Sequence, residues 1–413
     1  MNVSFQPRVS PIGYTNYVDV TKILQTWPKW PIYDQNSLDA VTRVIKSNQL
    51  FAATEVMDFE NKFAQYIGTK FAVGVGNATQ GLHLALAALE VGIGDEVITS
   101  PCSWISSASC ILMQNAVPVF VDIEKDSLGL DPVLVKKSIN KYTKAIILVH
   151  ILGYPSRVEE IRDLAKKFNI FLIEDASHAP GAIVSEKKLG SFGDISVFSL
   201  HQRKAISTGD GGVICTDNFQ IAEKLRKLRS FGSEELSYNY RMTEFSAALA
   251  KEGLKELDID NTHRAWAASY LNELLEDVPW ARVRTVTPPN KGVYYAIAIE
   301  LSLPDEEALN LLNHFLSLGV SMRKMFDPLN RHPHFNDQPI PARGQPWKHP
   351  DYYGLMRRHI YAEQELPVSY EFCYGKILEL YAHPGTTSDH LKAFAEEMRN
   401  YFDQQERKVI EHT

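Results

Sequence analysis

The sequence predicts an α/β protein in which a large, mainly parallel β-sheet lies between two layers of helices, followed by a smaller α+β domain. Seven short runs rich in Val, Ile and Phe occur between residues 71 and 216, and helix-like segments separate most of them. Strands that alternate with amphipathic helices are typical of parallel sheets with helices on both faces. After about residue 255 the pattern changes to a strand-like run, two helical stripes and a loop rich in Pro and His.

The seven runs are bounded by turn-forming residues, as expected for buried strands. In chain order they are FAVGV (71–75), EVIT (96–99), VPVFVD (117–122), KAIILVHIL (144–152), IFLIED (170–175), ISVFS (195–199) and GVICT (212–216). Ligands of open α/β sheets bind beyond the carboxyl ends of the strands. Polar residues directly after these runs are therefore the first candidates for a functional site.

Helices are predicted where apolar residues recur at helical spacing. Such stripes are formed by Leu82, Ala85, Leu86 and Leu89, and by Ile161, Leu164 and Phe168. Beyond the predicted strand YYAIAIEL (294–301), further stripes are formed by Ala308, Leu311, Leu312, Phe315 and Leu318, and by Leu391, Phe394, Ala395 and Met398. We expect an N-terminal arm at residues 1–30, a large domain at 31–255 and a small domain at 256–413.

Composition excludes several classes of protein. A hydrophobic fraction of 45% and a charged fraction of 23% are typical of a globular protein rather than a disordered one. With 43 basic and 50 acidic side chains the net charge is −7, so no general basic field attracts nucleic acid. The four cysteines lack metal-site spacing, no signal peptide is evident, and no run approaches ~18 apolar residues. We therefore expect a cytoplasmic protein without a metal, a nucleic-acid partner or a membrane segment.

The segment GNATQG (76–81) follows the first predicted strand and opens a predicted helix. Small residues at such a turn leave backbone N–H groups free to face an anion, and the helix dipole favours a phosphate there. The same segment also suits an ordinary helix cap by Asn77 or Thr79. This motif alone does not choose between the two.

Two further motifs follow later strands. In EDASHAPGA, Asp175 ends a strand after Glu174, and His178 comes three residues later. Asp175 can pair with a cationic ring nitrogen or simply cap a turn. Lys204 lies between two strands beside Arg203, where crowding can lower the pKa of an amine that forms a Schiff base. A phosphate cradle, an acidic ring partner and a lysine at strand ends of one sheet are together what pyridoxal phosphate requires.

At these motifs the sequence resembles the DegT/DnrJ/EryC1/StrS sugar aminotransferases, which have an aspartate-aminotransferase-like fold, over about residues 35–400. The matching segments are VGNATQGLHLALAALEVGIGDEVITSP, IEDASHAPGA, FSLHQRKAISTGDGGVICT, YNYRMTEFSAAL and LGVSMRKMFDPLNRHPHF. In this order they resemble the family's phosphate, aspartate and lysine motifs, a segment that reaches across the dimer interface into the partner's site, and a segment of the small domain. The resemblance implies pyridoxal 5'-phosphate as cofactor and a homodimer with shared active sites.

The resemblance also implies catalytic roles. Lys204 would form the imine with the cofactor and shuttle the proton, Asp175 would pair with the pyridine nitrogen, and His178 would lie near the 3-hydroxyl. The phosphate would be held by Ala78, Thr79 and Ser199. Ala78 stands where the family's pattern has a glycine, which would strain the turn if that position requires a positive φ.

The resemblance also assigns roles to four further residues. Some of these roles have an alternative interpretation, and some involve a second subunit. Trp104 would stack on the pyridine ring or pack in a helix core. Asn239 would reach the phosphate of the partner subunit. Arg241 would contact substrate across the same interface or form an ion pair with Glu244. Arg323 would bind substrate, and together with Lys324, Arg331 and His332 it would bind phosphates or lie on a solvated loop.

The function implied by the resemblance is transfer of an amino group from glutamate or glutamine to a keto-sugar, most often a nucleotide-linked one. The opening QTWPKWPIYD resembles relatives that aminate inosose rings, so a cyclitol is the alternative acceptor; an arm packed on its own dimer explains the same segment. Two hypotheses from different classes also stay open: a sugar dehydratase, which has His in place of the lysine, and a binding module without turnover. Lys204 argues against the dehydratase, although His201 lies nearby.

Overall fold

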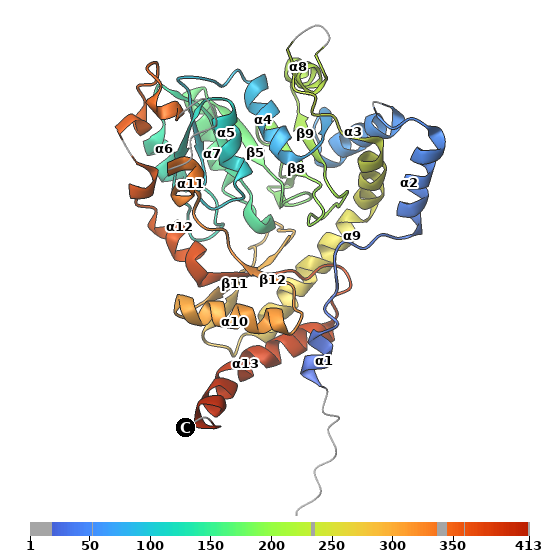
Figure 1. The fold of residues 1–413 in the computed structure, drawn as a ribbon, viewed down its shortest axis with the longest axis vertical. Coiled ribbons are helices and arrows are strands. Elements are labelled where there is room, and N and C mark those ends of the chain that lie inside the picture. Colours follow the sequence, from blue (N-terminus) through green and yellow to red (C-terminus); the bar gives the residue numbers. More distant parts are fainter. Residues whose placement is uncertain (1–18, 52, 233–235, 337–344, 359, 412–413) are drawn as a thin grey trace, which may run out of the picture.

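A seven-stranded sheet forms the centre of the large part of the protein (Figure 1). The computed structural model describes residues 19–51, 53–232, 236–336, 345–358 and 360–411. The strands are β1 (Phe71–Val75), β2 (Glu96–Thr99), β3 (Val117–Phe120), β4 (Thr143–Val149), β5 (Phe171–Asp175), β8 (Ile195–Ser199) and β9 (Gly212–Thr216). All seven predicted runs thus form strands of one sheet.

The order across this sheet is β1-β9-β8-β5-β4-β2-β3. Neighbours from β8 to β3 pair in parallel, whereas β9 runs antiparallel to both β1 and β8. The prediction of a mainly parallel sheet is therefore confirmed. The run that predicts a strand to residue 152 ends at Val149, because residues Ile151–Gly153 form a tight turn with Leu152 at φ +54°.

Helices cover both faces of the sheet. They are α2 (Gln35–Ser47), α3 (Thr54–Ile67), α4 (Ala78–Ala88), α5 (Ser106–Met113), α6 (Pro132–Ser138), α7 (Val158–Phe168), α8 (Phe219–Arg229) and α9 (Glu244–Leu274). Along β1, Val73 and Val75 pack with residues of α4 and α8, whereas Ala72 packs with α3 and α9. Side chains alternate between the two faces of a strand, so this division gives the three predicted layers.

The smaller part is built on a four-stranded antiparallel sheet of order β10-β11-β13-β12. Its strands are β10 (Ala281–Val283), β11 (Ile297–Leu301), β12 (Met322–Lys324) and β13 (Ile377–Leu380). The helices α10 (Asp305–Ser317) and α13 (Ser388–Glu411) bury Phe315 and Phe394 against each other and in the same apolar core as this sheet. Short elements are β6 (Ile183–Val184), β7 (Lys187–Lys188), α11 (Pro333–Asn336) and α12 (Pro367–Glu371).

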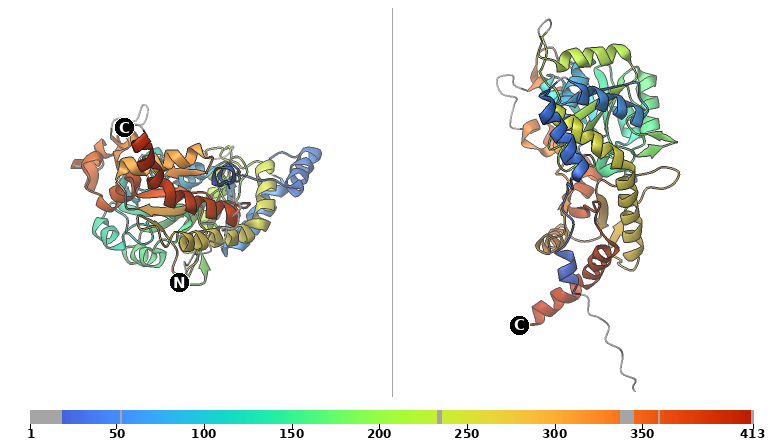
Figure 2. Two further views of the ribbon diagram at one scale, coloured as in Figure 1. Left: turned by 90° about the horizontal axis from the view of Figure 1, so that it is seen from below. Right: turned by 90° about the vertical axis from the view of Figure 1, so that its right-hand side faces the viewer.

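Helix α9 joins the two parts of the protein (Figure 1). It is 31 residues long and passes through residues 255 and 256, where the sequence predicts a domain boundary. A continuous helix, not a linker, therefore stands at that position. Figure 2 shows the small sheet with α10 and α13 at one end of the molecule and the large sheet at the other.

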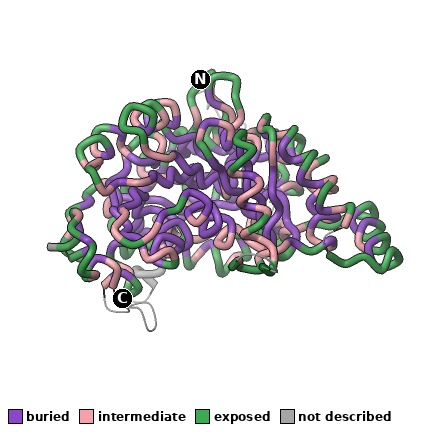
Figure 3. Tube along the Cα trace, turned by 90° about the horizontal axis from the view of Figure 1, so that it is seen from above, coloured by how far each residue is buried: buried purple, intermediate pink, exposed green. Residues whose placement is uncertain are grey.

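The described end of the N-terminal arm packs on the small part. Helix α1 (Val20–Leu24) lies beside α13, and the indole N–H of Trp27 donates a hydrogen bond to the backbone oxygen of Tyr381 (3.0 Å). Residues 1–18 of the predicted arm lie outside the described residues. Figure 3 shows buried residues through the middle of the molecule and exposed residues along its rim. No helix in the described part of the chain combines the length and the apolar character that crossing a membrane requires.

Candidate active site

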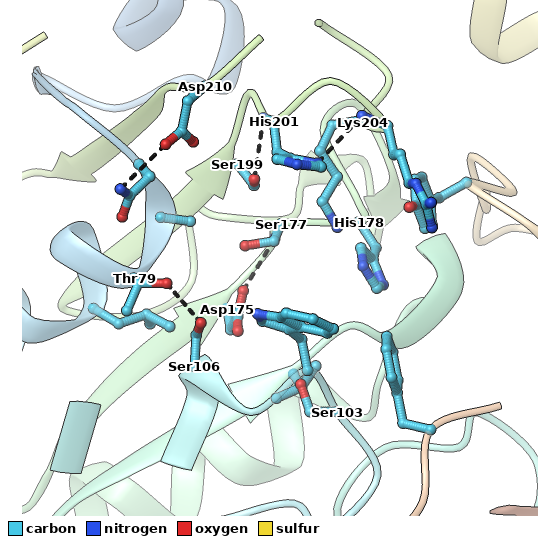
Figure 4. A pocket seen from close by; sticks show the side chains of 18 of the residues that line it. Thr79, Ser103, Ser106, Asp175, Ser177, His178, Ser199, His201, Lys204 and Asp210 are labelled. Carbon is cyan, nitrogen blue, oxygen red and sulfur yellow. Dashed lines mark hydrogen bonds between the residues drawn. The ribbon is translucent and has the colours of Figure 1, made fainter. Parts of the chain in front are cut away.

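A cavity of about 500 Å³ lies where the carboxyl ends of β4, β5 and β8 face the small part of the protein (Figure 4). A volume of this size suits a cofactor or a small substrate. Eight of the residues to which the family resemblance assigns a role line it: Ala78, Thr79, Trp104, Asp175, His178, Ser199, Lys204 and Arg323. Asn239, Arg241, Lys324, Arg331 and His332 are not among its lining residues.

Helix α4 begins at one end of this cavity. The side chain of Asn77 accepts the N–H of Gln80 (3.0 Å) and so caps the helix. The other N–H groups of the first turn have no acceptor within the helix, and its dipole favours an anion. Ser199, at the end of β8, lines the same cavity. The helix cap and the anion site are therefore compatible. Ala78 is the first residue of the helix, and its φ is not positive, so alanine causes no strain at this turn.

Gly212 lets the start of α4 lie directly against strand β9. A Cβ atom at this position would come within 2.7–2.9 Å of backbone atoms of Asn77 and Ala78. A side-chain carbon does not approach other non-bonded atoms so closely, so any larger residue would push the helix end away from the sheet. Glycine therefore fixes the position of the proposed phosphate cradle.

Asp175 is held by hydrogen bonds at the end of β5. Its Oδ2 accepts the hydroxyl of Ser107 (2.6 Å), which in turn lies 2.7 Å from the hydroxyl of Ser103. Its Oδ1 accepts the backbone N–H of Ser177 (3.2 Å), so the turn contact that the sequence leaves open is also present. The residue is only 5% exposed. The carboxylate therefore has a fixed orientation toward the cavity.

Glu174, the neighbouring carboxylate, has a different role. Its two oxygens accept the backbone N–H groups of Gly190, Phe192 and Gly193 at 2.7–2.8 Å, and Oε2 lies 3.1 Å from Nε2 of His150. Glu174 is fully buried and is absent from the cavity lining. Adjacent residues of a strand point to opposite faces, so Glu174 organises the 190–193 turn while Asp175 faces the cavity.

His178 presents a neutral ring to the cavity. Burial lowers its pKa well below the ordinary value, and the positive charges of Lys204 and Arg323 lower it further. Its Nδ1 accepts the backbone N–H of Leu152 (3.1 Å). In a neutral ring the proton must then be on Nε2. The ring also stacks on Tyr295, with centroids 4.3 Å apart and planes inclined by 14°.

The amine of Lys204 lies inside the cavity (Figure 4). Its Nζ is 4.6 Å from the centre of the Tyr295 ring, and within the described residues it has neither a hydrogen bond nor an ion pair. Loss of hydration lowers the pKa of Lys204 to about 7; Asp175 opposes this shift and Arg323 adds to it. Near neutral pH much of the amine is therefore uncharged and nucleophilic.

Trp104 and Arg323 enter the cavity from opposite parts of the protein. The Trp104 side chain precedes α5, is 57% exposed and meets Phe326 edge to face, with centroids 5.8 Å apart. Packing in a helix core, the second interpretation of Trp104, is therefore wrong. Arg323 comes from β12 and forms an ion pair through Nε with the fully buried Glu379. Its Nη2 is buried and has no hydrogen-bond partner in the described part of the structure.

The Asn239 and Arg241 side chains lie together outside the cavity. Nε of Arg241 donates to Oδ1 of Asn239 (3.0 Å), and its guanidinium lies 4.9 Å from the ring centres of Phe51 and Phe231. Glu244, the alternative ion-pair partner, instead accepts backbone N–H groups of residues 53, 55 and 56. The backbone oxygen of Tyr240 accepts the N–H of Gly76 (3.1 Å), so this segment lies beside the turn that leads into α4.

Several residues of the site were not predicted. Ser103 and Ser107 orient Asp175, and the serine-rich SPCSWISSAS after the second predicted strand is a signal that could have indicated them. Tyr295 lies between His178 and Lys204, but its sequence context indicates only a strand. No cluster of three or more His, Cys, Asp or Glu side chains suited to a metal occurs in the described ranges of the chain.

The cavity fits pyridoxal phosphate on the chemistry of its residues. A helix end that favours an anion, a buried and oriented carboxylate, and a lysine amine with a pKa near neutrality surround one space at the strand ends. Fold and site together define a pyridoxal phosphate-dependent enzyme of the aspartate aminotransferase type. Residues 31–348 match the DegT/DnrJ/EryC1/StrS aminotransferase family, and the chain belongs to this family of pyridoxal phosphate-dependent aminotransferases.

Curated relatives and solved structures agree with this assignment. L-glutamine:2-deoxy-scyllo-inosose aminotransferase of Streptomyces kanamyceticus is 33% identical over 336 residues, covering 74% of this chain and 79% of that protein. A dTDP-3-amino-3,6-dideoxy-alpha-D-galactopyranose transaminase of Aneurinibacillus thermoaerophilus is 36% identical over 276 residues, covering 65% and 76%. The X-ray structure of an aminotransferase from Psychrobacter cryohalolentis superposes with a TM-score of 0.81 at 26% identity, covering 92% and 99%. The predicted fold and enzyme class are confirmed.

The two adjacent carboxylates generate a paired prediction. Asp175→Asn is expected to lower turnover by about 10²–10³-fold while changing the free energy of unfolding little. The amide oxygen can still accept the N–H of Ser177, and the amide NH₂ can donate to the Ser107 hydroxyl, which then donates to Ser103. Glu174→Gln is expected to lower the free energy of unfolding by about 2 kcal/mol, because its new NH₂ group faces the N–H of Gly190. Its turnover per folded molecule should remain.

Urea unfolding and turnover corrected for the folded fraction distinguish the two carboxylates. Each variant is the control for the other, since the residues are neighbours on one strand. Equal losses of stability and of turnover in both variants would contradict the division of roles.

Proposed function

We propose that the protein transfers the amino group of glutamate or glutamine to the keto group of a sugar, in amino-sugar biosynthesis. The observation that carries this proposal is the Lys204 amine, which shares one cavity with Asp175 at the strand ends and has neither a hydrogen bond nor an ion pair among the described residues. A nucleotide-linked keto-sugar is the preferred acceptor, supported by the similarity to a dTDP-amino-sugar transaminase. An inosose-type cyclitol is the second candidate, supported by the similarity to an inosose aminotransferase.

Pyridoxal phosphate, when bound, supplies a reactive carbonyl group and a ring that withdraws electrons from a neighbouring carbanion. The first turn of α4 at Ala78 and Thr79, with Ser199, would bind its phosphate. Asp175 would keep the ring nitrogen protonated, and Trp104 would cover one face of the ring. The Nε2–H of His178 would donate to the 3-hydroxyl oxygen.

Lys204 would hold and move the proton of the reaction. Its uncharged amine can take a proton from the α-carbon of the donor and return it to the carbon that was the aldehyde. The same amine then serves the reverse steps with the keto acceptor, which gives a ping-pong cycle of two half-reactions. The neighbouring Tyr295 ring and His178 exclude water from the side where the amine lies.

Arg323 is the proposed carboxylate-binding residue for the amino donor. Glu379 engages its Nε, and Glu379 is itself held by the hydroxyl of Tyr381 (2.6 Å). The free Nη2 is the donor that remains for a substrate oxygen. Because a guanidinium with a fixed position loses little entropy on binding, this pair is well suited to orient the α-carboxylate.

We also propose that the active enzyme is a homodimer with shared sites. Phe51 and Phe231, which both contact the Arg241 guanidinium, are 60% and 63% exposed. Apolar groups of this size at a surface are typical of an interface. Burying them against a second copy would bring Asn239 and Arg241 toward the partner's phosphate and substrate. We expect this dimer in the cytoplasm, where its four buried, free cysteines would stay reduced. Cell fractionation would test this location.

The lysine distinguishes this proposal from a dehydratase on the same scaffold. The dehydratase hypothesis requires His at the position of Lys204, whereas His201 is exposed at the cavity rim and its Nδ1 accepts the N–H of Arg203 (3.3 Å). Membership of an aminotransferase family also argues against a binding module without turnover.

A substrate screen tests the function. Purified protein with pyridoxal phosphate is incubated with glutamate or glutamine and with keto-sugars, free or nucleotide-linked, and inososes, and products are identified by mass. We expect the keto group of one acceptor to become an amine, and no product with Lys204→Ala. Amination of an inosose alone would select the cyclitol, and sugar deoxygenation without amination would favour the dehydratase.

The lowered pKa of Lys204 predicts a pH dependence. In the full-length protein freed of cofactor, covalent attachment of pyridoxal phosphate to Lys204 should accelerate as the pH rises and level off above about pH 7. The reason is that only the unprotonated amine attacks, and protonation below the pKa removes it. Borohydride reduction followed by peptide mass analysis measures the rate. A rate that continues to rise to pH 10 would show an ordinary, hydrated lysine.

Subunit mixing tests the shared sites. Lys204→Ala and Asn239→Ala are each expected to be impaired, but a random mixture should regain about one quarter of wild-type sites, because half of the dimers hold one intact site. The control mixture, Lys204→Ala with Asp175→Asn, should regain none, since both residues serve the same subunit's site. Failure of the first mixture in dimers shown by light scattering to have exchanged subunits argues against sharing.

A further inference from the structure

The arm segment WPKWP (27–31) makes contacts that the proposed function does not yet use. Its two tryptophans face different parts of the protein. The indole N–H of Trp27 donates to the backbone oxygen of Tyr381 next to β13, whereas that of Trp30 donates to the backbone oxygen of Lys204 (3.0 Å each). The contact of Trp30 joins residues 174 positions apart in the chain.

The contact with Trp30 helps to fix the position of the Lys204 main chain. It lies in a loop between β8 and β9 that has no regular structure, and its N–H donates to the oxygen of His201 within that loop (2.8 Å). Its C=O is engaged by Trp30 from the arm. A half-buried carbonyl without a donor is costly, so the arm supplies the second of the two anchors that fix this residue.

A second contact of the arm lies three residues further along both segments. The hydroxyl of Tyr33 is 3.1 Å from Oγ of Ser207. Trp30 and Tyr33 thus engage Lys204 and Ser207 as two adjacent points along the same loop. Two points of attachment fix the direction of a loop segment as well as its position.

Trp30 is itself rigidly held. Its ring stacks on His383, with centroids 4.9 Å apart and planes inclined by 19°, and the guanidinium of Arg264 lies 5.4 Å from its centre. His383 and Arg264 are 5% and 1% exposed. A tryptophan between a buried ring and a buried cation keeps its N–H in one direction. Its hydrogen bond therefore transmits the position of the small part of the protein to the lysine loop.

We propose that Trp30 is a positioning residue for the reaction, and that its indole N–H holds the main chain of Lys204 so that the amine stays in the cavity above Tyr295. This inference rests on the proposed role of Lys204 in amino transfer. A loop released from Trp30 would move the amine from its reacting position and admit water. A small misplacement of a reacting group lowers the reaction rate far more than it weakens substrate binding.

Trp30→Phe is the test, because phenylalanine keeps an aromatic ring against His383 but has no N–H. We expect kcat to fall about tenfold with the KM for glutamate unchanged within about twofold. The second readout is the pKa of the Lys204 amine in the full-length protein freed of cofactor, measured by pH-dependent acetylation and peptide mass analysis. It should rise above that of the wild type, because added hydration favours the charged amine.

Trp27→Phe is the matched control. It removes the same kind of indole hydrogen bond from the same arm, but at Tyr381 rather than at the lysine loop. It should lower Tm without changing kcat or the pKa of Lys204. Equal effects of the two variants on all three quantities, or an unchanged kcat and pKa in Trp30→Phe, would overturn the proposal.

Tyr33→Phe keeps the proposal testable if Trp30→Phe does not fold. Tyr33 is 44% exposed, so loss of its hydroxyl should not endanger folding. We expect the same two readouts to change in the same directions, with kcat about threefold lower. No change in either readout would overturn the two-point attachment. The amine pKa does not require turnover, so the absence of aminotransferase activity in the wild type would refute the proposed function and leave this test intact.

Discussion

The partial shielding of the Lys204 amine from water is the constraint on which the rest of the site depends. An amine in water stays protonated at neutral pH, and a protonated amine neither attacks a carbonyl nor accepts a proton. The protein lowers the pKa of this group to about 7 by enclosing it beside Tyr295, with Arg323 reinforcing the shift. Asp175 works in the opposite direction, and a bound pyridinium would take up its negative charge. The carboxylate that disfavours a neutral lysine is thus the one proposed to pair with the cofactor ring.

Local patterns were enough to predict the large sheet and the residues at its carboxyl edge. Each of the seven apolar runs is a strand, and because parallel strands end at one edge, Asp175 and Ser199 meet in the same cavity. Because side chains alternate along β5, Glu174 and Asp175 point to opposite faces of the sheet, but the sequence pattern does not tell which of the two faces the cavity. That assignment follows from the turn at 190–193, whose three N–H groups require a buried acceptor.

Contacts between distant segments were beyond the reach of such patterns. Tyr295 and Trp30 come from segments that the sequence assigns to a strand and an arm, and Glu379 comes from a segment for which no strand was predicted. Only packing of the small part brings these three residues to the lysine. The apolar run through residue 152 carried no sign that its end would turn and present the N–H of Leu152 to His178. Asn239 and Arg241 lie outside the cavity of a single chain, as the proposed sharing of sites between two subunits requires.

Helix α9 sets a limit on motion. At 1.5 Å per residue its 31 residues extend about 46 Å, and they run through both parts of the protein without an interruption in the helix. Opening the cavity by a hinge at the predicted boundary would break backbone hydrogen bonds inside this helix. We therefore expect side chains and loops at the cavity rim to control the entry of substrate and the departure of product. Differences in rate between related enzymes of this construction should then be sought in those loops rather than in the angle between the two parts.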